Sequence, residues 1–134
     1  MKRLPILLAA FVTLAISVPA FAAETSTYAF SAQNDSGEKG KATIKPAGSG
    51  MEVTVNLEGA PADAEQPIHI HKGTCAKFDP KPMYMLTSVT KGVSKTKLDV
   101  PMSTLAEGDY VINVHKSVKE IATYVSCADL KPAK

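Results

Sequence analysis

The sequence contains no tryptophan, and it has only two cysteines and three histidines among 134 residues. Arginine is scarce too, because Arg3 is the one arginine of the chain. Proteins that recognise nucleic-acid phosphates rely on a basic excess and usually on arginine. The formal net charge of the whole chain is +2, and Lys2 and Arg3 alone account for it. The composition therefore argues against a nucleic-acid-binding protein.

The chain also lacks a hydrophobic run that would span a membrane comfortably. Residues 4–18 are almost entirely apolar, but a transmembrane helix needs about 20 such residues. Lys2 and Arg3 precede this run, and Ala20-Phe21-Ala22 supplies a small-x-small cleavage pattern after it. These are the three parts of a secretory signal peptide. We therefore expect residues 1–22 to be removed and the mature chain, without a membrane span, to be periplasmic or secreted.

The remaining residues, 23–134, suffice for one domain and are too few for two. Short alternating segments separated by glycine, proline and asparagine predict β-strands, and the first three look like an antiparallel meander. The predicted strands cover residues 25–33, 38–45, 51–57, 66–71, 83–89, 93–100, 108–115 and 124–130, with a short helical turn at 101–107. Seven or eight short strands at this spacing are typical of an all-β sandwich or barrel.

Two of the three histidines lie two residues apart, in the segment Ile68-His69-Ile70-His71. Alternate side chains of a strand point to the same face, so both imidazoles would project together while both isoleucines enter the core. Paired imidazoles on one rigid face can converge on a single metal ion. The alternative is a half-buried strand whose polar face happens to carry two histidines.

Three further residues are candidate metal ligands. His115 falls on the face of its predicted strand opposite to Ile112 and Val114, and so away from the apolar side. Met83 and Met85 alternate on another predicted strand, and their thioethers are soft ligands that suit Cu(I). Methionine at alternate positions more often fills a core, so both interpretations of this pair stay open.

The two cysteines, Cys75 and Cys127, allow one intramolecular pairing. An exported chain meets an oxidising compartment, which favours a disulfide between them. The alternative is that one of them is a thiolate metal ligand or a nucleophile.

Three segments together resemble copper–zinc superoxide dismutase in their order and surroundings, and most closely its small exported relatives with a reduced barrel. They are His69-x-His71 before Gly73 and Cys75, then Val114-His115-Lys116, then Val125-Ser126-Cys127. The resemblance implies an eight-stranded Greek-key β-barrel whose disulfide ties the loop after the H-x-H strand to the last strand. It also implies that His69, His71 and His115 are copper ligands.

The chain departs from that family in two places. No histidine lies between His71 and His115, so the bridging histidine and the zinc ligands of the family are missing and no zinc is expected. Tyr124 stands three residues before the second cysteine, where the family enzyme has an arginine that attracts superoxide. Full dismutase activity is therefore not expected.

These observations lead to three hypotheses. The first is an exported copper-binding protein that sequesters, delivers or senses copper, with a copper-handling protein as its partner. The second is a copper-only superoxide dismutase of low activity. The third is a metal-free structural or interaction module that kept the scaffold and the disulfide while its histidines became ordinary surface residues.

Overall fold

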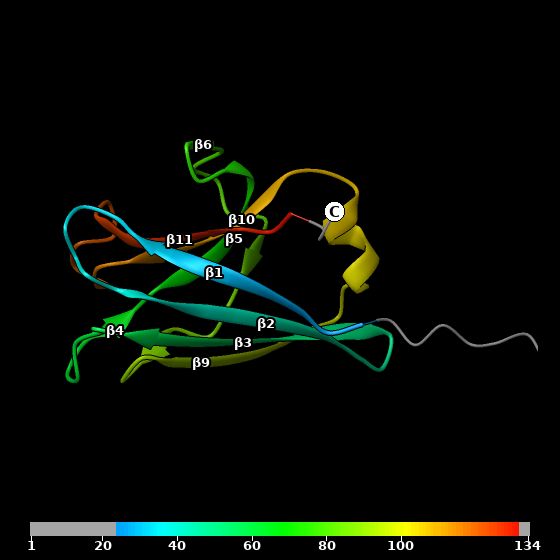
Figure 1. Ribbon diagram of the computed structural model, residues 1–134, viewed down its shortest axis with the longest axis horizontal. Coiled ribbons are helices and arrows are strands. Elements are labelled where there is room, and N and C mark those ends of the chain that lie inside the picture. Colours follow the sequence, from blue (N-terminus) through cyan, green and yellow to red (C-terminus); the bar gives the residue numbers. More distant parts are fainter. Residues whose placement is uncertain (1–23, 132–134) are drawn as a thin grey trace, which may run out of the picture.

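The computed structural model describes residues 24–131, which form an all-β fold with one short 3₁₀ helix (Figure 1). The predicted signal peptide, residues 1–22, lies outside the described residues. The long strands are β1 (Ser26–Ala32), β2 (Lys39–Ala47), β3 (Gly50–Glu58), β5 (Ile68–Thr74), β9 (Val93–Leu98), β10 (Tyr110–His115) and β11 (Tyr124–Asp129). The short elements are β4 (Glu65–Gln66), β6 (Lys77–Phe78), β7 (Tyr84–Met85), β8 (Val89–Thr90) and the helix η1 (Met102–Ala106).

Every strand pairing in the described residues is antiparallel, in the order β4-β8-β9-β3-β2-β1-β11-β10-β5-β6, with β7 also on β5. The predicted meander of the first three segments is confirmed, because β1 pairs with β2 and β2 with β3. β1 also pairs with the last strand, β11. The sheet therefore curls, and β2, β3 and β9 form one layer below β10, β11 and β5 (Figure 1).

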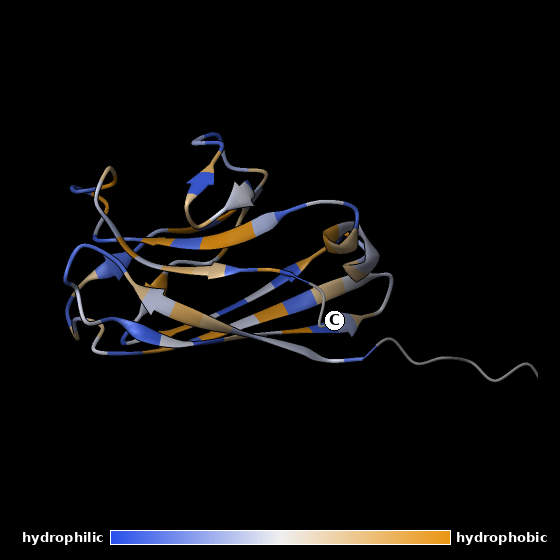
Figure 2. Ribbon diagram, turned by 45° about the horizontal axis from the view of Figure 1, so that its top comes forward, coloured by the Kyte–Doolittle hydropathy of each residue, from blue (hydrophilic) through white to orange (hydrophobic). Residues whose placement is uncertain are grey.

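The core lies between these layers and follows from the alternation of side chains along the long strands (Figure 2). On β3, Met51, Val53 and Val55 are completely or almost completely buried, as the sequence pattern predicts. Ile68 and Ile70 of β5 are buried as well. Burying one such aliphatic side chain stabilises the fold by about 1.5–3 kcal/mol, so this inward face fixes the register of each strand.

One predicted strand is wrong, because residues 83–89 do not form a continuous strand. The first part of this segment is bonded to β5, and its later part is bonded to β9. The backbone N–H of Leu86 donates to the carbonyl of Ile68 on β5 at 3.2 Å, whereas that of Thr87 donates to the hydroxyl of Thr96 on β9 at 2.8 Å. The strand count also differs from the expected seven or eight: the described residues contain seven long strands and four two-residue strands.

The predicted disulfide is confirmed between Cys75 and Cys127. It joins the segment that follows β5 to the middle of β11, two strands away across β10. The carboxylate of Asp129 strengthens the same junction by accepting a hydrogen bond from the backbone N–H of Cys75 at 2.9 Å. The thiolate alternative is therefore excluded for both cysteines.

Removing this cross-link should weaken the fold substantially. The two cysteines are 52 residues apart, and closing a loop of this length stabilises a protein by about 4 kcal/mol in the chain-entropy model. We expect the Cys75→Ala/Cys127→Ala variant to lose free energy of unfolding of that order in urea denaturation. Wild-type protein with its disulfide reduced should show the same loss. A change below about 1 kcal/mol in both samples would contradict the structural role of the disulfide.

Candidate metal centre

The three histidines project from neighbouring strands onto one face of the sheet. β5 and β10 are antiparallel, with Asn113 opposite His69 and Val111 opposite His71. Paired residues of an antiparallel sheet share a face, and residues two apart on one strand do so too. His115 is two residues beyond Asn113, so it lies diagonally across from His69. The sequence prediction that the histidines face away from the core isoleucines is confirmed by this register.

The imidazole rings form a compact group. Nδ1 of His69 and Nε2 of His115 are 3.0 Å apart, and one ring nitrogen from each of the three histidines lies within 4.8 Å of the others. His69, His71 and His115 are only 7%, 1% and 5% exposed. The interpretation as ordinary surface residues is therefore wrong. Three buried nitrogens at this separation could hold one metal ion.

Two backbone carbonyls fix the tautomers of two of these rings. Nδ1 of His71 lies 2.8 Å from the carbonyl oxygen of Asp79, and Nδ1 of His115 contacts the carbonyl of Ile121. A carbonyl oxygen only accepts hydrogen bonds, so both Nδ1 atoms carry the proton. The Nε2 atoms of His71 and His115 are then left with a free lone pair, as in the metal sites where a second hydrogen bond orients the ligand.

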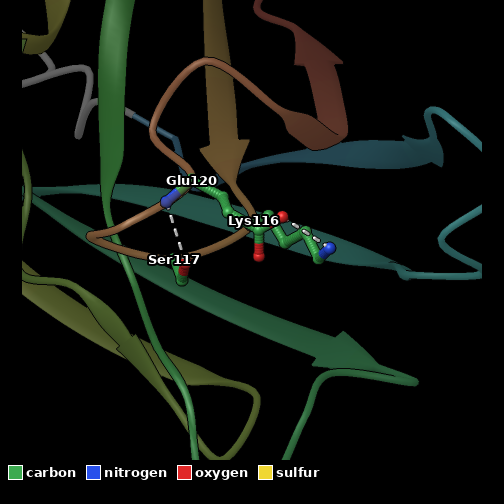
Figure 3. A network of polar contacts seen from close by, with 3 residues as sticks. All are labelled: Lys116, Ser117 and Glu120. Atoms are coloured by element: carbon green, nitrogen blue, oxygen red, sulfur yellow. Dashed lines mark hydrogen bonds and ion pairs between the residues drawn. The ribbon is translucent and has the colours of Figure 1, made fainter.

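The loop of residues 116–123 holds the Ile121 carbonyl in place. It is closed at its base by the backbone N–H of Lys116, which donates to the carbonyl of Thr123 at 2.8 Å. Within the loop, the backbone N–H of Glu120 donates to the hydroxyl of Ser117 at 3.1 Å, and its carboxylate pairs with the Lys116 ammonium at 2.8 Å (Figure 3). This network makes the loop a defined support for His115.

Two aromatic rings also cover the histidines. The Phe78 ring packs on His71 with centroids 5.0 Å apart, and the Tyr124 ring packs on His115 at 5.1 Å. The two aromatic rings also contact each other at 5.3 Å. Gly73 allows this arrangement, because a Cβ at its positive φ of 120° would lie 2.6 Å from the Phe78 backbone. The cover explains why the histidines are buried although they face away from the core.

Sequence reasoning did not identify these supporting residues. Asn113 is one of them: it is buried opposite His69, its amide donates to the side chain of Gln33 at 3.0 Å, and its Oδ1 atom has no partner within the described residues. An asparagine in an otherwise apolar strand is a signal that could have been noticed. Phe78 lies in the two-residue strand β6, and the carbonyls of Asp79 and Ile121 lie in irregular segments. Alternation gives no information about segments this short or irregular.

The two candidate methionines lie outside the group of three histidines. Met83 is 41% exposed and Met85 is 64% exposed, so the interpretation that they fill the core is wrong. Met85 is nevertheless paired directly with His69 in the β5–β7 ladder. Met85 and His69 are therefore on the same face of the sheet.

Burial lowers the pKa of two of the three histidines. Burial, together with smaller contributions from the neighbouring His115 and His71, lowers the pKa of His69 from its usual 6.5 to about 4. Burial also lowers the pKa of His115; the Ile121 carbonyl opposes this shift, and His71 adds to it. A neutral imidazole is the form that binds metal, so the lowered pKa values favour the ligand form of His69 and His115.

Comparison of the chain with models of protein families, with curated proteins and with solved structures found no match. No helix within residues 24–131 is long and apolar enough to cross a membrane. The assignment of a function therefore depends on the chemistry of the histidine group.

The lowered pKa of His69 makes the stability of the metal-free protein depend on pH. The unfolded chain protonates this residue below about pH 6.5, but the folded protein does so only near pH 4. The unfolded state thus binds more protons in that window, and stability falls as the pH is lowered from 6.5 to 4, by about 2–3 kcal/mol. Urea denaturation between pH 4 and 7 measures this loss.

The matched control is His69→Gln, which keeps a polar side chain but cannot titrate. The free energy of unfolding of this variant should change less over the same pH range. Both proteins contain the same carboxylates, so the difference between their pH dependences gives the contribution of His69. Equal pH dependence in both proteins would contradict the burial of a neutral imidazole at this position.

Proposed function

We propose that this protein is an exported copper-binding protein on a superoxide-dismutase-like Greek-key barrel. It holds copper through His69, His71 and His115, and it sequesters the metal, senses it or passes it to a copper-handling partner. The copper is cargo or signal in this proposal, and it is not a catalyst.

The observation that carries the proposal is the Nε2 atom of His71. This atom is buried and has no hydrogen-bond partner among the described residues, while its own Nδ1–H is held by the Asp79 carbonyl. Leaving a buried polar atom unpaired costs about 1–3 kcal/mol. A metal ion bound to this lone pair would remove that cost. His71 also belongs to the group in which one ring nitrogen of each histidine lies within 4.8 Å of the others.

The donor set favours copper over zinc. Three neutral imidazoles suit both ions, but affinity for such a site follows the Irving–Williams order, in which Cu²⁺ exceeds Zn²⁺. The described residues place no cysteine thiolate or carboxylate in the group, and the two cysteines are paired. Zinc bound to proteins commonly uses such anionic ligands.

The proton on His69 bears on how this group would hold copper. Nε2 of His115 has only a lone pair, so Nδ1–H of His69 donates the 3.0 Å hydrogen bond between them. If a metal were bound by these two nitrogens, the neutral His69 ring would carry its proton on Nε2 in place of Nδ1.

The disulfide and the strand order support the resemblance on which the scaffold proposal rests. The cross-link joins the segment after the His69-x-His71 strand to the last strand, which is the connection that the resemblance implies.

The aromatic cover argues against rapid dismutase turnover. Tyr124 occupies the position at which the family enzyme has an arginine, and its ring packs on His115. The site thus has a covering aromatic ring in place of a positive charge that would draw in an anion. A protein that retains copper benefits from such shielding, whereas an enzyme that turns over superoxide needs access.

A conservative substitution tests the site without removing its support. His71→Asn keeps an amide N–H at the place of Nδ1, for the Asp79 carbonyl, but removes the lone pair of the imidazole Nε2. We expect its affinity for Cu(II) to fall at least roughly tenfold, with unfolding free energy in the metal-free state unchanged within about 1 kcal/mol. Competition with a chelator and electron paramagnetic resonance would measure the binding.

The wild-type protein should bind one Cu(II) with a nitrogen-rich signal and prefer it to Zn(II). The His69→Ala/His71→Ala/His115→Ala variant should lose that signal. The proposal fails if both proteins show the same weak, adventitious binding. Superoxide removal by the copper-loaded wild type at the rate of an efficient enzyme would instead favour the dismutase hypothesis.

A further inference from the structure

Two exposed methionines, Met83 and Met85, lie on the segment that pairs with the histidine strand β5, and neither belongs to the buried core. We propose that Met83 and Met85 form a thioether site for Cu(I) beside the histidines, so that the protein takes up copper in its reduced state. This inference rests on the proposed function and specifies the oxidation state of its metal.

The first support is the register of β7 on β5. Met85 is opposite His69, and Tyr84 is opposite Ile70. Cross-strand partners share a face of the sheet, so the methionine lies on the histidine face and the tyrosine on the core face. Tyr84 does pack against the core. Met83 lies in a bend immediately before β7, so the register places Met85 on this face and Met83 at the start of the same segment.

The second support is that the backbone fixes this segment beside the histidines. The N–H of Met83 donates to the carbonyl of Ile70 at 2.8 Å, and that of Leu86 donates to the carbonyl of Ile68 at 3.2 Å. These bonds flank Met85 on both sides. The thioethers are thus held at the edge of the site by the strand that carries His69 and His71.

The third support is exposure. Methionine in a soluble protein usually fills gaps in a core, and Met51 of this chain does so at 0% exposure. Met83 and Met85 are 41% and 64% exposed instead. Their sulfur atoms are therefore available to an ion from solvent, whereas the imidazoles are almost completely covered.

The chemistry of the two donor types is complementary. Thioether sulfur is a soft ligand that selects Cu(I), and imidazole suits copper more generally. Neither donor carries a charge, so a singly charged cation is not held by ion pairing. An outer thioether pair and an inner imidazole group would offer a reduced copper ion ligands both at the surface and within the fold.

The competing explanation is an apolar surface that docks a protein. Ile121 is 46% exposed, and its carbonyl contacts His115, so an apolar side chain is exposed near this histidine as well. Replacing methionine by leucine separates the two explanations, because it keeps the apolar surface and removes only the sulfur.

The test uses the mature, disulfide-intact protein and Cu(I) under anaerobic conditions, with competition against a Cu(I) chelator. Met83→Leu/Met85→Leu should bind Cu(I) about tenfold more weakly than wild type or worse, and sulfur scattering should disappear from the copper X-ray absorption spectrum. Met102→Leu, which removes a thioether from helix η1, is the matched control and should behave like wild type.

Cu(II) binding, measured on the same samples, reports on the histidines separately. If Cu(II) binds through the histidines but the leucine variant matches wild type in Cu(I) affinity and in its absorption spectrum, the thioether site is overturned and the proposed function stands. If wild type binds neither ion, both are overturned. Loss of Cu(I) affinity with an unchanged Cu(II) signal is the result that we expect.

Discussion

The antiparallel register between β5 and β10 determines where all three imidazoles lie. It pairs His69 with Asn113 and so brings His115 diagonally next to His69. A slip of one residue would turn every side chain of β5 to the opposite face, exchanging histidines for isoleucines. The register is held by burial of Ile68 and Ile70, and the disulfide from the end of β5 to β11 secures the strand on the far side of β10. The core and the candidate site are therefore products of the same alternation.

Position alone does not make a ligand group, and the irregular segments supply the rest. The carbonyls of Asp79 and Ile121 hold protons on Nδ1 of His71 and His115. The rings of Phe78 and Tyr124 pack on the same two imidazoles and cover them. Burial also favours the neutral form of His69 and His115 by lowering their pKa. Each of these contributions comes from a loop or a strand end, while the strands carry the histidines themselves.

The sequence alone predicts the features that depend on the alternation of side chains along a strand and on the number of cysteines. The two-residue period predicts that His69 and His71 share a face and that Ile68 and Ile70 share the other. Two cysteines in a chain that is expected to be exported predict the Cys75–Cys127 bond. Periodicity does not specify which strands are neighbours, so the proximity of His115 rested on a family resemblance. The split of residues 83–89 between two partners was missed because both halves alternate equally well; only tertiary pairing divides them.

The protonation of the three imidazoles before and after Cu(I) is added tests the metal site most directly. It can be measured by ¹⁵N nuclear magnetic resonance. We expect His71 and His115 to keep their Nδ1 protons in both states, because the carbonyls of Asp79 and Ile121 accept hydrogen bonds from them. His69 should change from an Nδ1–H to an Nε2–H ring when copper replaces its hydrogen bond to His115. Ring nitrogen signals that stay the same at all three residues would contradict a metal site at this group.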